Sequence, residues 1–277
     1  MTGDTKATVP MAITMGDASG VGPEIVLRRA AEGAFCDDAV VVYGDAAILR
    51  HGAELLGVDV EIAAIDDPGQ WIPGRALQVV DLALLRAVDH RPGQIDAASG
   101  AAARQYVVAA TNDALAGRVA GIVTMPMNKE ATQLSDPAFV GHTELIAAAC
   151  GVQRFTMMLT AGDLAVTHVS THVSLREAIR RVTTARVTEV IELTDETLHR
   201  FLAQPRIAVC GVNPHAGDTV CSDPRTPNRS CPPLKQRGLQ GSMQPVPIRP
   251  TRSSTRPFIA SGSMPSSACI TTKATHR

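Results

Sequence analysis

The chain has 277 residues, of which 45% are hydrophobic and 19% charged, and its formal net charge is −1. This length suits one large or two moderate α/β domains, and a charge near zero argues against a nucleic-acid-binding protein. Residues 1–10 are polar and no apolar run approaches the roughly 18 residues of a membrane span, so we expect a cytoplasmic protein that binds neither membrane nor nucleic acid.

Apolar strands and helices alternate along the first half of the chain. The expected strands, rich in β-branched residues, lie at 11–15, 39–43, 60–65, 77–80 and 121–124. The expected helices lie at 23–31, 46–56 and 101–116. This alternation predicts an α/β fold with mostly parallel sheets covered by helices on both faces.

A second group of elements follows residue 141. The first expected helix of this group ends near residue 150, and two more lie at 175–182 and 184–202. The expected strands lie at 155–160, 164–170 and 206–212, and a turn at 161–163 joins the first two. We assign this group to most of a second α/β domain.

The composition changes immediately after Asp218. Residues 1–218 hold 17 basic and 26 acidic residues, a net charge of −9, whereas residues 219–277 hold 9 basic residues and one acid, a net charge of +8. Nine of the 18 prolines also lie in 219–277, where no apolar spacing is sustained. We therefore expect 219–277 to be a disordered tail, so that the C-terminal part of the α/β fold is incomplete.

The first candidate site is the loop between the strand at 11–15 and the helix that follows. Its three glycines, Gly16, Gly20 and Gly22, let backbone amides approach an anion, although they suit a tight strand-to-helix turn equally well. The loop also carries Asp17, whose negative charge disfavours a phosphate placed directly on it. A substrate hydroxyl, an amine or a metal-linked water is the better partner for this carboxylate.

Two further segments place polar side chains where ligands bind. His142 and Thr143 open the helix after Gly141, where the threonine can cap the helix and the histidine can donate to an anionic substrate. Lys129 follows the strand at 121–124, and open α/β sheets bind ligands beyond the carboxyl ends of their strands. Capping alone, and a lysine that is merely exposed, are the alternatives.

His172 and His215 each follow the carboxyl end of an expected strand. Such ends converge on one crevice, and neutral imidazoles suit a divalent metal ion. Two ligands are fewer than the three of a usual catalytic site, and an isolated buried histidine is more often structural. Both interpretations stay open at this point.

These segments together resemble the 4-hydroxythreonine-4-phosphate dehydrogenase family of vitamin B6 biosynthesis. The matching strings, between about residues 9 and 218 and in the family's order, are MAITMGDASGVGPE, GIVTMPMNKEA, GHTELIAAACG, LAVTHVSTHVSLREAI and GVNPHAGD. The resemblance implies a fold like those of isocitrate and isopropylmalate dehydrogenases, with two α/β domains. It also implies a homodimer whose active sites lie at the subunit interface.

The family's chemistry is oxidation of a substrate 3-hydroxyl by NAD or NADP, after which the β-keto acid loses CO₂. The resemblance implies that His142 and Thr143 contact the phosphorylated substrate and that His172 and His215 bind a divalent metal (Zn, Mg or Co). The metal would coordinate the substrate hydroxyl and stabilise the enolate. The family's third metal histidine lies in a later YHDQGH motif, followed by cofactor-binding residues, and this chain lacks that motif.

The binding strings also resemble one branch of the family. GDASGVGPE and TMPMNKEA differ from the commoner GDPAGIGPE and its relatives and are similar to the branch that acts on 4-phospho-threonate or 4-phospho-erythronate. These substrates share with 4-phosphooxy-threonine a 3-hydroxyl next to a carboxylated carbon, so the mechanism does not separate them. Position 2 of the substrate does.

A change of reading frame would account for the break at Asp218. With permitted synonymous codons, dropping two bases from Thr219 onward gives GLFGPEDAESIVPA, and residues 244–253 give AGPDPADTVF. Residues 261–277 give GFDAVVCMYHDQGHAP, which contains the missing motif. We therefore hypothesise a single-base deletion near the codons for Asp218 and Thr219.

The leading prediction is a metal-dependent, NAD(P)-linked dehydrogenase of 4-phosphooxy-threonine, with 4-phospho-threonate or 4-phospho-erythronate as the alternative substrate. The chain as written is expected to bind metal weakly and to lack turnover. The alternative to an enzyme is a non-catalytic protein that only binds a phosphorylated ligand.

Overall fold

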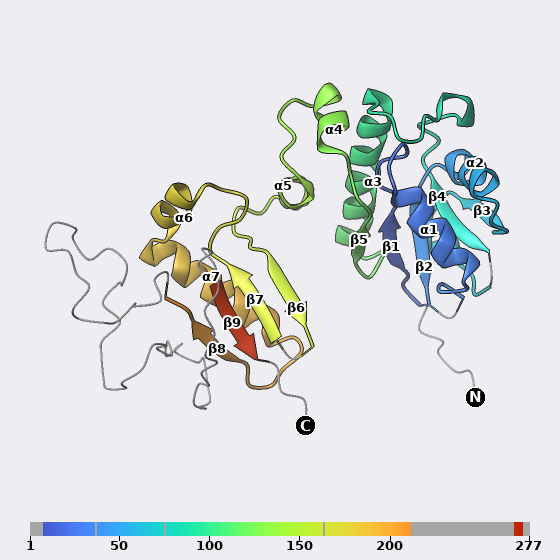
Figure 1. Cartoon of the computed structure of the whole chain (residues 1–277). Coiled ribbons are helices and arrows are strands. Elements are labelled where there is room, and N and C mark those ends of the chain that lie inside the picture. Colours follow the sequence, from blue (N-terminus) through green and yellow to red (C-terminus); the bar gives the residue numbers. More distant parts are fainter. Residues whose placement is uncertain (1–7, 37, 75, 163, 212–268, 274–277) are drawn as a thin grey trace, which may run out of the picture. The chain divides into compact units, whose positions relative to one another are not determined.

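A computed structural model describes residues 8–36, 38–74, 76–162, 164–211 and the backbone of 269–273. The chain separates into two compact units, Met1–Gln153 and Arg154–Arg277 (Figure 1). Each unit has its own sheet and its own cluster of buried apolar side chains.

The first unit is built on a five-stranded sheet in the order β3-β4-β2-β1-β5, with all pairings parallel (Figure 1). Its strands are β1 (Met11–Thr14), β2 (Val40–Gly44), β3 (Ile62–Ile65), β4 (Leu77–Asp81) and β5 (Ile122–Thr124). Ile13 in the centre of β1 aligns with Val42 of β2 and Val123 of β5. The parallel α/β sheet expected for this part of the chain is confirmed.

Helices connect these strands and cover both faces of the sheet. The connecting helices are α1 (Gly22–Ala31), α2 (Ala46–Leu56) and α3 (Ala97–Leu115), with 3₁₀ turns η1 (Pro68–Gln70) and η2 (Ala87–Asp89). Helices α4 (Lys129–Ser135) and α5 (His142–Ala149) follow β5 and pack against α3. α1 leads from β1 to β2, whereas α3 leads from β4 back across the sheet to β5, so right-handed crossovers place α1 and α3 on opposite faces. Strands β1 and β5 therefore flank a topological switch point, where open α/β sheets bind ligands.

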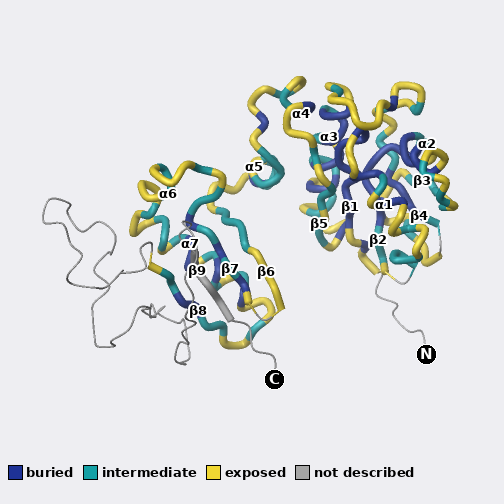
Figure 2. The backbone as a smooth tube through the Cα atoms, in the orientation of Figure 1, coloured by how far each residue is buried: buried dark blue, intermediate teal, exposed yellow. Residues whose placement is uncertain are grey.

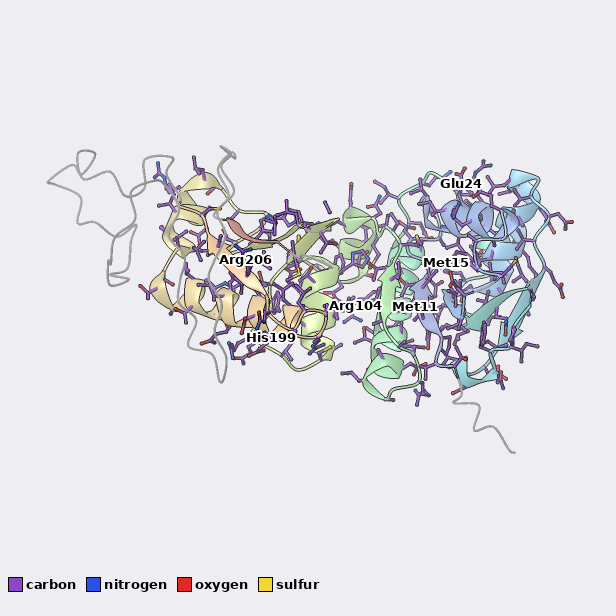
Figure 3. The ribbon with its side chains drawn as sticks, turned by 90° about the horizontal axis from the view of Figure 1, so that it is seen from below. Met11, Met15, Glu24, Arg104, His199 and Arg206 are labelled. Atoms are coloured by element: carbon purple, nitrogen blue, oxygen red, sulfur yellow. The ribbon has the colours of Figure 1, made fainter. Side chains whose placement is uncertain are left out.

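The central strands of the first unit are among the most deeply buried segments of the described residues (Figure 2). Residues 41–43 of β2 are fully buried, and this continuous apolar run is typical of a parallel strand covered on both faces. Met15, just beyond β1, is fully buried, whereas Glu24 points from α1 away from Met15 (Figure 3). In the described part of the chain, no helix is long and apolar enough to cross a membrane.

Helix boundaries follow local capping residues. α2 ends at Gly57, whose φ of 63° is the left-handed conformation that glycine adopts readily. α3 begins at Ala97, four residues before the start expected from the sequence, and the side chain of its N-cap residue Asp96 accepts a hydrogen bond from the Ser99 amide. α4, which the sequence did not predict, has seven residues and is too short to show a periodic apolar pattern.

The second unit has an antiparallel sheet in the order β6-β7-β9-β8 (Figure 1). Its strands are β6 (Met158–Ala161), β7 (Leu164–His168), β8 (Arg206–Val209) and β9 (Cys269–Lys273), and its helices are α6 (Leu175–Arg181) and α7 (Thr184–Leu198). The prediction of mostly parallel sheets is therefore wrong for this unit, because a tight hairpin joins β6 to β7 and β9 runs opposite to both of its neighbours. Its core consists of Ala165, Val190, Ile191, Leu198 and Ile207.

Strand β9 belongs to the segment 219–277, for which the sequence predicts disorder. It lies between β7 and β8, with Thr271 aligned with Val166 and Ala208. Its central residues, 270–272, are β-branched and suit a strand, but so short a run among prolines gives no clear periodic signal. Residues 212–268 and 274–277 lie outside the described residues.

Candidate functional site

The loop between β1 and α1 packs tightly against the segment that follows β5. Gly16 has a φ of +76°, and a Cβ atom there would lie 2.5 Å from the carbonyl oxygen of Pro126. A Cβ atom on Gly22 would lie 2.2 Å from the carbonyl oxygen of Met15. Both distances are too short for a side chain, so the close approach of backbone requires glycine here. The carboxyl ends of β1 and β5 therefore meet in one place.

Asp17 lies in this loop with only 2% of its surface exposed. Its backbone N–H donates to the Pro126 carbonyl at 3.0 Å, and its Oδ1 accepts from the Ser19 amide at 2.9 Å. Burial raises the pKa of Asp17 above its usual range, and the nearby charge of Asp96 acts in the same direction. A buried carboxylate without a cation among the described residues is typical of a ligand site.

Lys129 lies at the start of α4, directly beyond β5. The Asn128 side chain accepts from the Ala131 amide at 3.0 Å and so caps this helix. Lys129 is exposed, and no residue that the structure describes forms an ion pair with it. A cation at a helix N-terminus is disfavoured by the helix dipole, so helix stability does not explain this lysine. An anionic ligand would account for it, and the alternative of a lysine that is merely exposed also stays open.

His142 opens α5, whose N-cap is Gly141. No side chain caps this helix, so the alternative that Thr143 serves only as the cap is wrong. The backbone carbonyl of Met125 interacts with the His142 ring, whose Nε2 is buried without a hydrogen-bond partner among the described residues. Burial lowers the pKa of His142 below its ordinary value of 6.5, so the ring is neutral at neutral pH. Buried polar atoms are normally bonded, and a ligand would satisfy this one.

The structure adds Thr14 and Asn128 to the expected residues. Thr14 ends β1 beside Thr124, and its fully buried Oγ1 also has no hydrogen-bond partner in the described parts of the chain. Its carbonyl accepts from the Met125 amide at 3.2 Å. A threonine inside an apolar strand gives no signal in the sequence. Asn128 could have been found as a capping residue three positions before Ala131.

Three of the expected residues therefore lie around the same end of the first unit. Pro126 contacts Asp17, Met125 contacts His142, and Lys129 follows three residues after Pro126. A buried carboxylate, an exposed ammonium, a neutral imidazole and the free amides of the first turn of α5 are combined there. This set suits a small molecule that carries both an anionic group and a hydroxyl.

His172 lies in the second unit, four residues after the end of β7. It is exposed, and its φ of 55° is unusual for a residue other than glycine. Its expected partner, His215, lies outside the described residues. Among the residues that are described, no group of three His, Cys, Asp or Glu side chains could hold a metal ion. The described residues alone therefore do not fit a catalytic metal site.

The chain matches one family of known proteins over most of its length. The sequence model of the family "Pyridoxal phosphate biosynthetic protein PdxA" matches residues 36–222. The chain is 40% identical over 215 residues to the D-threonate 4-phosphate dehydrogenase of Salmonella typhimurium, which covers 76% of this chain and 65% of that protein. Identity to the protein of the same name from Pectobacterium atrosepticum is 39% over 212 residues, which covers 75% of this chain and 65% of that protein.

A solved structure matches as well. The crystal structure of 4-hydroxythreonine-4-phosphate dehydrogenase from Klebsiella pneumoniae superposes with a TM-score of 0.72 at 40% identity and covers 76% of this chain and 66% of that one. The chain thus spans slightly less than two thirds of the length of these relatives. The family match extends over more than half of the chain, and the chain belongs to the pyridoxal phosphate biosynthetic protein PdxA family.

Proposed function

We propose that the first unit binds the substrate of an NAD(P)-linked dehydrogenase that oxidises and decarboxylates a 4-phosphorylated hydroxy acid. The observation that carries this proposal is the buried, unpartnered Nε2 of His142 at the start of α5, beside the joined ends of β1 and β5. D-Threonate 4-phosphate is the first candidate substrate, because two of the relatives above are named for it. 4-Hydroxythreonine 4-phosphate, named for the Klebsiella structure, is the second.

Each side chain of the site suits one part of such a substrate. The free amides of α5 and the Thr143 hydroxyl can donate to phosphate oxygens, and His142 can donate from Nε2 once the bound anion favours the protonated ring. Lys129 can neutralise a phosphate or carboxylate charge. Asp17 can accept a hydrogen bond from the group at position 2, which is a hydroxyl in D-threonate 4-phosphate and an ammonium in 4-hydroxythreonine 4-phosphate.

Oxidation needs groups beyond those of the first unit. We propose His172 and His215 as ligands of a divalent metal (Zn, Mg or Co), which would make the substrate hydroxyl easier to deprotonate. NAD or NADP would accept the hydride. The described residues do not complete a metal site, so we assign to them substrate binding only.

The chain as written is proposed to bind substrate without turnover, because its reading frame changes near Asp218. The reversal of charge in 219–277 supports this, as does the YHDQGH motif recovered from residues 261–277 in the shifted frame. The isocitrate dehydrogenase-like pair of α/β domains, the homodimer and the cytoplasmic location are proposed for the protein in its restored frame.

An assay of reduced nicotinamide with both forms of the protein tests this function. The frame-restored protein, supplied with a divalent metal and NAD or NADP, is expected to oxidise D-threonate 4-phosphate, whereas the chain as written forms no NADH or NADPH. Turnover by the chain as written would contradict the frame proposal. If the restored protein turned over neither of the two substrates, the assigned reaction would be contradicted.

A further inference from the structure

A pair of histidines supports the loop that carries Asp17. The Nε2 atom of His90 lies 2.9 Å from the carbonyl oxygen of Ala18, and its Nδ1 atom lies 3.1 Å from Nδ1 of His51. The two rings stand edge to face with their centroids 5.2 Å apart. His90 is buried and His51, on α2, is half-buried, so the pair links the loop to the protein surface.

The segment that follows His90 holds the loop at two more points. The Gly93 amide donates to the Ser19 carbonyl at 2.7 Å, and the hydroxyl oxygens of Ser19 and Ser99 lie 3.0 Å apart. Residues 90–99 therefore anchor Ala18 and Ser19, the two residues directly after Asp17. Displacement of this segment would move the Asp17 carboxylate.

The hydrogen bonds define where protons lie in the pair. A carbonyl only accepts, so Nε2 of His90 carries a proton, and Nδ1 of the neutral ring is then an acceptor. His51 must donate from its own Nδ1. A further proton can enter at Nε2 of His51 without disturbing either bond. A proton on Nδ1 of His90 would instead place its N–H group against the Nδ1–H group of His51, and the two donors would repel each other.

The surroundings of the pair favour a neutral His90. Burial lowers the pKa of His90 most strongly. The hydrogen bond to Ala18 raises it in part, and the neighbouring His51 and Arg91 lower it further. The Arg91 guanidinium also donates to the His90 carbonyl at 3.0 Å. The ionisable groups on the elements around the pair are Arg50, His51 and Glu54 on α2, Asp89 on η2 and Arg86 at its N-cap, and Arg91, Asp96 and Asp17 in the neighbouring segments.

We propose that His51 and His90 form a proton-sensitive brace that positions Asp17 for ligand binding. While the pair holds at most one excess proton, His90 stays bonded to Ala18 and the loop keeps its shape. A second proton forces the two Nδ1 atoms apart and loosens the loop. Both histidines are positioning residues. The effect on ligand binding rests on the proposed function, whereas the effect on the loop does not.

Hydrogen exchange of the loop amides in the full chain measures how firmly the brace holds the loop, and it needs no ligand. The informative amides are those of Asp17, Ser19 and Gly20, which donate to Pro126 and to Asp17 itself. Protection factors, which correct for the direct effect of pH on exchange, are measured by mass spectrometry in the presence of a metal chelator. Wild type is expected to show roughly tenfold lower protection at about pH 5 than at about pH 7.

Three substitutions separate the brace from ordinary packing. His90→Gln places an amide nitrogen near the position of Nε2 and should keep the loop protected at both pH values. His90→Phe fills the space without the bond and should lower protection at every pH. His51→Ala removes the opposing N–H group and should abolish the loosening in acid. His199→Ala, at an exposed position in the second unit, is the control and should match wild type.

Equal protection in wild type and His90→Phe would overturn the brace, as would loosening in acid that persists in His51→Ala. Thermal unfolding checks that each variant folds. If His90→Phe does not fold, His90→Gln and His51→Ala still test the brace. Calorimetric titration with D-threonate 4-phosphate should give affinities that follow the protection. If wild type does not bind at any pH, the proposed function fails while the exchange result still judges the brace.

Discussion

Gly100 of α3 sets the separation between α3 and α4, and therefore the position of Lys129. A Cβ atom at Gly100 would lie 2.3, 2.4 and 2.5 Å from backbone atoms of Ala131 and Thr132. Ordinary contacts begin at 3.4 Å, so the substitution Gly100→Ala requires α4 to move by about 1 Å. Backbone atoms cannot turn aside as the end of a side chain can.

The size of the effect follows from two opposing contributions. Alanine exceeds glycine in helix propensity by about 1 kcal/mol. Overpacking against rigid backbone opposes this with about 3 kcal/mol. We expect a net loss of about 2 kcal/mol in the free energy of unfolding, which lowers the Tm by roughly 4–8 °C for a unit of this size. Because α4 begins at Lys129, the affinity for D-threonate 4-phosphate should also fall by roughly tenfold.

Thermal unfolding and calorimetric titration measure the two effects of Gly100→Ala. The matched control is Gly52→Ala in α2, where a Cβ atom meets only the terminal methyl of Leu27 at 3.1 Å. This methyl can turn aside, so the control should stay within about 1 kcal/mol of wild type. If Gly100→Ala were as stable as wild type and bound ligand equally well, the close approach of α3 and α4 would not position the site.

Three further predictions follow from buried polar groups. Tyr106→Phe removes a hydroxyl that donates at 2.7 Å to the fully buried Asp45, and should lower the free energy of unfolding by about 2 kcal/mol in a denaturant titration. Asp17→Asn should raise the Tm at neutral pH by a few degrees and weaken ligand binding, because burial raises the pKa of Asp17 and its ionised form destabilises the fold. Stability should fall as the pH drops below about 6.5, since burial lowers the pKa of His90 and His142 and the unfolded chain then binds more protons than the folded chain.

Each of these predictions has a control or a result that would contradict it. Tyr43→Phe should have a smaller effect than Tyr106→Phe, because Asp113, the partner of Tyr43, keeps its ion pair with Arg118. The gain in Tm from Asp17→Asn should shrink as the pH falls toward 3.8, and a loss of stability at neutral pH would show that the ionised carboxylate does not destabilise the fold. Unfolding curves that do not change between about pH 7 and pH 5 would show that the two buried histidines are not held neutral.

The strands of the first unit were predictable because a parallel sheet covered on both faces demands continuous apolar runs. The run of valines in β2 carries that signal, and α2 was predicted with its observed bounds because Gly57 ends it. The adjacent strands β6 and β7 with the turn between them were predicted and are confirmed, but the place of β8 in the same antiparallel sheet was not predicted. That place depends on β9, which comes from a segment whose composition gives no strand signal.

The candidate site was predictable where a residue follows the end of a strand or opens a helix. Asp17, Lys129 and His142 satisfy that rule, and the first unit brings their segments together. The contact of His90 with Ala18 was not predictable, because it joins residues 72 positions apart. Such a contact leaves no periodic trace in the sequence. The metal pair stays a prediction, since His215 lies outside the described residues.

Calorimetric titration of the chain as written with D-threonate 4-phosphate, in wild type and in His142→Ala, decides whether His142 lies at the centre of a substrate site. We predict saturable binding of one ligand per chain in wild type. We expect it to be weaker by roughly 10-fold to 100-fold in the variant, because a buried charge-assisted hydrogen bond is lost. Binding of equal strength in both proteins, or no binding to wild type, would contradict a substrate site centred on His142.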